Sequence, residues 1–233
     1  MHCDLMKQNN ARMTRMELRV GVAERPLHGE DRALVVPGIG LFGVFDGLGG
    51  EGGGAEAAEI ACLTVEASCR GTEASLQALV RAITDAQHAV VGAGPSHGYT
   101  TATVCWINEE LMHWVSLGDS RIYLQSRGGR LAMVSRDDGH GNIVDNYLGE
   151  NWRWRGVQQR QSVAVAPGDR IVLVTDGVTG DWEPDLLSER DLQRAIGGLD
   201  AEAAARRLIE VARKSDDRTA IVVDLTDSEA GHG

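Results

Sequence analysis

The chain has 233 residues, of which 42% are hydrophobic and 24% are charged, a composition typical of a globular protein with a sizeable buried core. Acidic residues outnumber basic ones by 34 to 23, which gives a formal net charge of −11. This excess argues against nucleic acid or an anionic membrane surface as the main partner, and it permits divalent cations. Only Lys7 and Lys214 are lysines, so recognition of phosphate would fall mainly to arginine.

The ends and the cysteines indicate a single cytoplasmic domain. No stretch approaches the roughly 18 apolar residues that cross a bilayer, and residues 1–16 lack the apolar core of a secretory signal. The four cysteines form no Cys-x-x-Cys pair, which favours reduced thiols. No linker rich in serine or proline divides the chain. We therefore expect one domain over residues 17–226, with disordered ends at 1–16 and 227–233.

The hydrophobic pattern predicts strands, a helix pair, a run of hairpin strands, a second helix pair and a last strand. The predicted strands are Glu17–Ala23, Arg32–Val36, Leu41–Phe45, Thr101–Ile107, Leu111–Leu117, Arg121–Ser126, Arg130–Val134, Arg170–Thr175 and Thr219–Leu225. The predicted helices are Ala55–Arg70, Glu73–Val91, Leu186–Ile196 and Ala201–Lys214, and Asp137–Gln161 is predicted to be irregular. Paired helices disfavour a parallel doubly wound sheet. We expect an α+β fold, a four-layer α/β/β/α sandwich of two antiparallel sheets flanked by helix pairs.

A glycine cluster at residues 47–52 satisfies the G-x-G-x-x-G pattern of dinucleotide-binding proteins, and it follows a predicted strand and precedes a predicted helix. Three features oppose that interpretation. Asp46 places a carboxylate where a pyrophosphate would approach, the expected single crossover helix is replaced by two, and the later strands look like antiparallel hairpins. These features favour another chemistry around Asp46.

Acidic residues gather at the ends of apolar strands. Asp46, Asp119 and Asp176 each follow or adjoin such a strand beside a glycine, and Glu30 and Asp216 precede two others. A single Asp-Gly is most often a turn. Several carboxylates at neighbouring strand ends would repel one another unless a cation neutralised them, and sites made only of oxygen ligands suit Mg²⁺ or Mn²⁺. The pattern therefore predicts a divalent metal centre.

The same residues carry a family resemblance: the sequence resembles the metal-dependent type 2C Ser/Thr protein phosphatases of the compact bacterial type. The matches extend in order from about Leu18 to Leu225, and six motifs at compatible spacing are far more specific than one. The matching motifs are Gly29-Glu30-Asp31, Val44-Phe45-Asp46-Gly47-Leu48-Gly49-Gly50, Thr100-Thr101-Ala102, Leu117-Gly118-Asp119-Ser120-Arg121, Leu173-Val174-Thr175-Asp176-Gly177-Val178 and Asp216-Asp217-Arg218-Thr219.

The resemblance implies a binuclear Mn²⁺ or Mg²⁺ centre in which Asp46, Asp176 and Asp216 carry catalysis. Asp46 would bridge the two ions, Asp176 and Asp216 would complete the shell of the first, and Glu30 with the carbonyl of Gly47 would hold the second. Such a centre activates water for attack on a phosphate ester without a covalent phosphoenzyme.

The resemblance also implies that Asp119, with Asp176, helps to hold a weaker third ion. Asp217 falls where the family has Asn or Asp, and it is expected beside the metal shell rather than in it. Leu48 replaces a histidine that many members carry as a candidate proton donor, so here a metal-bound water would have to protonate the leaving group. The family's phosphate-binding arginine aligns with Pro26, which makes the adjacent Arg25 the candidate phosphate ligand.

The segment Asn151-Trp152-Arg153-Trp154-Arg155 falls where the family carries a variable flap. Its alternation of tryptophan and arginine is compatible with a strand that has one aromatic face, and also with a docking site for a phosphopeptide or partner. Both interpretations stay open from the sequence.

The function expected from the sequence is that of a monomeric, cytoplasmic bacterial phosphatase that hydrolyses phosphoserine and phosphothreonine in the protein targets of a Ser/Thr kinase. Two alternatives remain: a catalytically silent phosphatase-like domain that binds a partner, and a phosphatase dedicated to one regulatory phosphoprotein. Retention of the acidic set argues against the silent domain. The fold does not distinguish a dedicated substrate from a general one.

Overall fold

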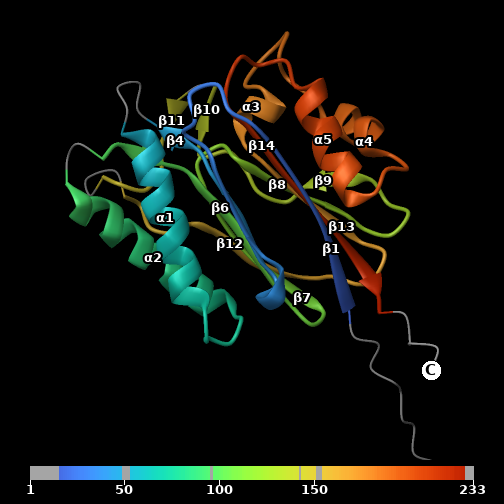
Figure 1. The fold of residues 1–233 in the computed structure, drawn as a ribbon, viewed down its shortest axis with the longest axis horizontal. Coiled ribbons are helices and arrows are strands. Elements are labelled where there is room, and N and C mark those ends of the chain that lie inside the picture. The colour runs from blue at the N-terminus through green and yellow to red at the C-terminus, as the bar shows by residue number, and fades with distance from the viewer. Residues whose placement is uncertain (1–15, 49–52, 95–96, 142, 151–153, 229–233) are drawn as a thin grey trace, which may run out of the picture.

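The computed structural model describes residues 16–48, 53–94, 97–141, 143–150 and 154–228 of the chain (Figure 1). Two five-stranded antiparallel sheets pack against each other, and a pair of helices covers the outer face of each sheet. The predicted α+β class and the four-layer α/β/β/α arrangement are confirmed.

The first sheet has the strand order β12-β7-β6-β3-β2, with β2 at Arg32–Val36, β3 at Leu41–Phe45, β6 at Ala102–Asn108, β7 at Leu111–Leu117 and β12 at Gln159–Ala164. Helices α1 (Gly54–Cys69) and α2 (Leu76–Ala93) cover it. Ser75 begins α2 because its hydroxyl accepts a hydrogen bond from the N–H of Ala78, which otherwise has no partner within the helix.

The second sheet has the order β1-β14-β13-β8-β9, with β1 at Met16–Arg25, β8 at Arg121–Gln125, β9 at Leu131–Met133, β13 at Arg170–Val174 and β14 at Arg218–Asp227. Helices α4 (Glu189–Ile196) and α5 (Ala201–Val211) cover its outer face. Short elements complete the fold: the 3-10 helix η1 (Pro37–Ile39), the one-turn helix α3 (Asp176–Thr179), and the two-stranded pairs β4 (Gly47–Leu48) with β5 (Tyr99–Thr100) and β10 (Gly139–His140) with β11 (Ile143–Val144).

Three hydrophobic cores separate the four layers. Because side chains alternate across a strand, a central strand buries residues in two cores at once. In β13, Ile171 and Leu173 lie in the core between the sheets, whereas Val172 and Val174 lie in the core under α4 and α5. Burial on both faces explains why this strand is a continuous apolar run rather than an alternating one.

Several local predictions differ from the structure. Helix α2 begins at Leu76 rather than Glu73, and α5 ends at Val211 rather than Lys214. Helix α4 begins at Glu189, not at Leu186, because Ser188 and Asp191 form a reciprocal capping box at its first turn. The stretch Asp137–Gln161, predicted to be irregular, contains β10, β11 and the beginning of β12. Strand β12 is at the edge of its sheet and is largely exposed, so it lacks the apolar signal of a central strand.

The described chain begins in β1 at Met16 and passes through β14 as far as Asp227, so these strands extend one residue beyond each bound of the expected domain. Residues 1–15 and 229–233, which the sequence predicts to be disordered, lie outside the described residues. None of the helices in the described part of the chain is both long and apolar enough to cross a membrane.

Candidate metal centre

Three predicted metal ligands meet at one end of the sandwich, the upper end in Figure 1, where strands of both sheets stop. Asp46 follows β3 of the first sheet, Asp176 begins α3 directly after β13 of the second, and Asp119 lies in the turn that leads from β7 to β8 and so from one sheet to the other. Each residue offers one carboxylate oxygen, and these oxygens all lie within 4.8 Å of one another. The packing of the two sheets therefore assembles the cluster.

The backbone of Asp46 is held by the Thr100-Thr101 motif. The N–H of Asp46 donates to Oγ1 of Thr101 at 3.0 Å, and its carbonyl accepts from the N–H of Thr101 at 2.8 Å and from Oγ1 of Thr100 at 3.0 Å. Three hydrogen bonds leave the strand end little freedom. The two threonines thus act as positioning residues that fix where the Asp46 carboxylate emerges.

Burial and neighbouring carboxylates oppose the ionisation of Asp46 and Asp119. Burial, followed by the charges of Asp176, Asp31 and Asp119, raises the pKa of Asp46 well above its usual value. Burial, followed by the charge of Asp176, raises the pKa of Asp119 to about 7. Both shifts indicate that the protein positions these groups against their own repulsion, as expected for groups whose charge a cation offsets.

The donor set fits a divalent cation such as Mn²⁺ or Mg²⁺. Every donor is a carboxylate oxygen, the type that such hard ions prefer. Oδ1 of Asp119 is buried and has no hydrogen-bond partner among the described residues. An unpartnered buried carboxylate oxygen is costly in a folded protein, and a bound cation would satisfy it.

Glu30 and Gly47 lie side by side next to Asp46. A Cβ on Gly47 would lie 2.8 Å from the carbonyl oxygen of Glu30, and a Cβ on Gly54 would lie 2.9 Å from Oε1 of Glu30. The two glycines therefore let the loop that carries Glu30 approach the start of α1 closely. Burial and the charge of Asp217 raise the pKa of Glu30, which extends the acidic centre to this side.

Asp217 holds the loop that carries Glu30. Its carboxylate accepts hydrogen bonds from four successive backbone N–H groups, those of Leu27, His28, Gly29 and Glu30. Burial opposes the charge of Asp217, but these donors outweigh it and bring its pKa down to about 2. Asp217 thus positions the loop that carries Glu30.

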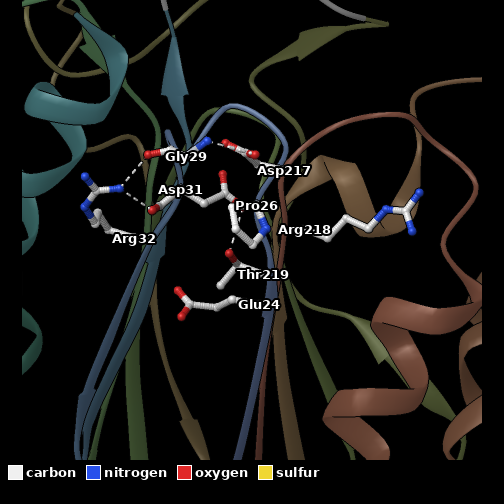
Figure 2. A pocket seen from close by; sticks show the side chains of 8 residues that line it. All are labelled: Glu24, Pro26, Gly29, Asp31, Arg32, Asp217, Arg218 and Thr219. Carbon is white, nitrogen blue, oxygen red and sulfur yellow. Dashed lines mark hydrogen bonds between the residues drawn. The ribbon is translucent and has the colours of Figure 1, made fainter. Parts of the chain in front are cut away.

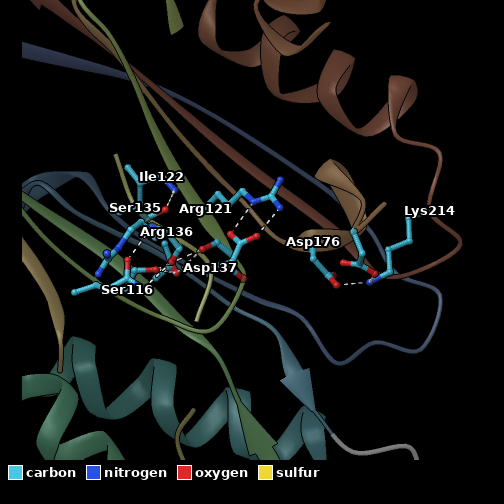
Figure 3. Close-up of polar contacts among 12 residues, drawn as sticks. Ser116, Arg121, Ile122, Ser135, Arg136, Asp137, Asp176 and Lys214 are labelled. Carbon is cyan, nitrogen blue, oxygen red and sulfur yellow. Dashed lines mark hydrogen bonds and ion pairs between the residues drawn. The ribbon is translucent and has the colours of Figure 1, made fainter. Parts of the chain in front are cut away.

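Asp216 reaches the cluster through a lysine. Nζ of Lys214 contacts Oδ2 of Asp176 (Figure 3). It also lies 3.0 Å from Oδ2 of Asp216 and 3.2 Å from Oδ2 of Asp181. Burial opposes the charge of Lys214, but Asp176 and Asp216 outweigh it and raise its pKa, so it remains an ammonium. The structure therefore brings Asp216 to Asp176 with a side-chain cation between them.

Sequence reasoning missed three charged groups of this centre: Asp31, Asp181 and Lys214. Oδ2 of Asp31 accepts hydrogen bonds from Thr175 at 2.9 Å and from Thr219 at 2.8 Å, and its Oδ1 is buried without a partner among the described residues. Burial raises the pKa of Asp31 to about 7, against the two hydrogen bonds. The available signals were the position of Asp31 next to Glu30 and the rarity of lysine in this chain.

The arginine of the Gly-Asp-Ser-Arg motif has a structural partner. Nε and Nη2 of Arg121 donate to the two carboxylate oxygens of Asp137 at 2.9 and 2.7 Å, as Figure 3 shows. This bidentate pair ties the segment after β9 to the first residue of β8, close to Asp119. Arg121 is thereby engaged in holding the turn.

A cavity of about 280 Å³ lies between the β1–β2 loop and β14. Its lining residues are Glu24, Pro26, Gly29, Asp31, Arg32, Asp217, Arg218 and Thr219 (Figure 2). Arg25 is the last residue of β1, is exposed and pairs in register with Arg218. Among the described residues it makes no ion pair with the carboxylates, so its guanidinium is available to a ligand.

The described half of the Trp-Arg segment is not a strand. Trp154 lies outside any strand and packs against the core under α1 and α2, and the N–H of Arg155 donates to Oδ1 of Asn146 at 3.4 Å. Residues 151–153, including Trp152 and Arg153, lie outside the described residues. Leu48, the residue in place of the family's histidine, pairs with Tyr99 between β4 and β5.

Comparison with known proteins identifies the family. The family profile described as "Protein phosphatase 2C" matches residues 27–215, which is most of the chain. The chain belongs to the protein phosphatase 2C family. A rice relative of the family, "Probable protein phosphatase 2C 33" of Oryza sativa subsp. japonica, is 26% identical over 300 residues, which cover 91% of this chain and 65% of the rice protein. The chain thus spans just under two thirds of that relative's length.

Solved structures share this protein phosphatase 2C fold. The catalytic domain of the phosphatase PstP, in complex with two manganese ions, superposes with a TM-score of 0.79 at 21% identity, covering 91% of this chain and 100% of that one. PppA, a regulatory component of the type VI secretion system in Pseudomonas aeruginosa, has a TM-score of 0.74 at 24% identity, with coverage of 90% and 98%. At these identities the likeness establishes the four-layer fold.

Proposed function

We propose that this chain is a metal-dependent phosphatase that hydrolyses phosphoserine and phosphothreonine in proteins. The observation that carries the proposal is the convergence of the Asp46, Asp119 and Asp176 oxygens within 4.8 Å in a member of the protein phosphatase 2C family. Carboxylates gathered in this way have little use without a cation. The retained acidic set therefore favours an enzyme over a catalytically silent domain.

The residues present would hold two Mn²⁺ or Mg²⁺ ions, the number of manganese ions in the PstP complex. Asp46 would help to hold both ions, Asp176 and Asp216 would help to hold one of them, and Glu30 with the carbonyl of Gly47 would help to hold the other. Asp119 faces Asp46 and Asp176 and would serve a third, weaker position together with Asp176. When bound, such ions lower the pKa of water and offset charge on phosphoryl oxygens.

The protein's own contribution is positioning. Thr100 and Thr101 fix Asp46, and Asp217 fixes the loop of Glu30 through its four backbone amides. Leu48 offers no proton at the position where many family members carry a histidine, so we assign no side chain of this chain to protonation of the leaving alcohol. Catalysis would then depend mainly on how well the acidic ligands are held in place.

We further propose that the enzyme acts as a monomer in the cytoplasm of a bacterium, on the targets of a Ser/Thr kinase. The reduced, unpaired cysteines Cys62, Cys69 and Cys105 support a reducing compartment. The arginine-rich, lysine-poor composition and the likeness to PppA of Pseudomonas aeruginosa support a bacterial source.

The direct test is hydrolysis of a phosphothreonine peptide and of an aryl phosphate by the full chain with Mn²⁺, with Mg²⁺ and with EDTA. We expect release of phosphate from both substrates with either ion, and none with EDTA. A matched phosphotyrosine peptide reports selectivity. If wild type binds Mn²⁺ but releases no phosphate from any substrate, the chain is a silent binding domain and the proposal is wrong.

Arg25 is proposed to bind the substrate phosphate, because it is exposed beside the β1–β2 loop and has no ion-pair partner among the described residues. We expect Arg25→Ala to raise KM for the aryl phosphate about tenfold with a much smaller change in kcat, since a charge-assisted hydrogen bond lost at an exposed site weakens binding by about 1.5 kcal/mol. Arg19→Ala, an exposed arginine on the same strand, is the control. An unchanged KM in Arg25→Ala would exclude the role.

A further inference from the structure

Lys214 is placed as an internal cation within the acidic centre. It follows α5, and its ammonium reaches the carboxylates of Asp176, Asp181 and Asp216, while its side chain is only 19% exposed. It is the only lysine in the described part of the chain. The ion pairs that Asp176, Asp181 and Asp216 form within that part are all to Lys214. One ammonium thus serves three carboxylates, matching its three donors.

The backbone of Lys214 is anchored by Arg218. Nε and Nη2 of Arg218 donate to the carbonyl of Lys214 at 3.2 and 2.6 Å, and Nη1 of Arg218 donates to the carbonyl of Ile209 at 3.2 Å. Arg218 therefore fastens the chain between α5 and β14 at this residue. The four-carbon stem of the lysine is flexible and can carry the ammonium out without a change of the backbone.

The ammonium uses oxygens that a divalent ion would need. Asp176 and Asp216 are the two residues proposed to serve one ion besides the bridging Asp46, and Oδ2 of each is engaged by Lys214. Two cations at the same oxygens repel each other. We propose, on the basis of the proposed function, that Lys214 is a tethered cation that competes with the divalent ion for Asp176 and Asp216 and stabilises the metal-free protein.

The competition has a quantitative consequence. If the ammonium has left the carboxylates in only about one tenth of the metal-free molecules, the apparent affinity of that position for a divalent ion falls about tenfold. A purely structural ion pair would behave differently, because its loss would leave the metal affinity unchanged or would weaken it by loosening the ligands. The direction of the change in affinity therefore distinguishes the two roles.

The test compares the full-length wild type with Lys214→Met, which removes the charge from a similar unbranched chain, and with Lys214→Arg, which keeps it. Arg213→Met is the matched control, because it removes one positive charge at the exposed neighbouring residue. Mn²⁺ binding is measured by titration calorimetry and by the electron paramagnetic resonance signal of free Mn²⁺. Melting temperature is measured in EDTA and in saturating Mn²⁺.

We expect Lys214→Met to bind Mn²⁺ about tenfold more tightly at the affected position and to melt at a lower temperature in EDTA. Lys214→Arg and Arg213→Met should stay close to wild type in both. Equal or weaker Mn²⁺ binding by Lys214→Met would overturn the inference. If wild type and variants bind Mn²⁺ with the expected ranking but hydrolyse no phosphate ester, the proposed function is wrong and the inference about Lys214 stands. Absence of Mn²⁺ binding in all four proteins would overturn both.

Discussion

Asp46→Asn is expected to lower kcat for Mn²⁺-dependent hydrolysis of an aryl phosphate about 100-fold or more, because a neutral amide is a poor bridge between two divalent ions. The same change should leave the melting temperature in EDTA unchanged or higher. Burial and the charges of Asp176, Asp31 and Asp119 oppose ionisation of Asp46, so its removal relieves repulsion in the metal-free protein. Steady-state kinetics and thermal melts with and without EDTA check both parts.

Asp85→Asn is the matched control for Asp46→Asn. Asp85 lies on α2, where its carboxylate accepts an exposed hydrogen bond from Ser68 at 3.1 Å and makes no ion pair within the described residues. The same loss of charge there should change neither the rate nor the melting temperature measurably. An Asp46→Asn protein that kept the wild-type rate would show that the carboxylate cluster is not the catalytic centre.

Gly177→Ala is expected to damage the fold and the site together. A Cβ on Gly177 would run into the carbonyl oxygen of Asp217 and would lie 3.3 Å from Cβ of Asp216. Because the obstacle is mainly backbone, the segment before β14 must move away from α3. We expect a loss of about 1–3 kcal/mol in the free energy of unfolding. We also expect kcat to fall about 100-fold, because Asp216, and Asp217 with the loop that it holds, would move away from Asp176.

Gly92→Ala is the control for that substitution. Gly92 lies in α2, and a Cβ there would meet nothing within 4 Å. Replacing a helical glycine by alanine at an open position should stabilise the protein by about 0.5–1 kcal/mol with no effect on rate. Urea unfolding and steady-state kinetics of the two variants test the pair. Wild-type stability and rate in Gly177→Ala would show that the close approach of α3 to Asp217 does not matter.

Much of the fold could be predicted because its signals are local. The continuous apolar run of β13 arises from burial on both faces of the strand, and the helical period of the paired helices arises from burial on one face. Both signals can be read from the sequence. The hydrophobic pattern did not predict edge strand β12, and it placed the start of α4 three residues too early. The first carries no apolar period, and the second depends on hydrogen bonds between Ser188 and Asp191 that hydrophobicity does not encode.

The candidate site, like the fold, could be predicted from the sequence only in part. The sequence alone determined which acids follow buried strands, because an apolar run that ends in Asp-Gly is visible residue by residue, as at Asp46 and Asp176. Only the tertiary structure decided that the oxygens of Asp46, Asp119 and Asp176 converge within 4.8 Å, that Asp217 holds the loop of Glu30, and that Lys214 enters the centre. These contacts join residues far apart in the chain, and the packing of one sheet on the other creates them.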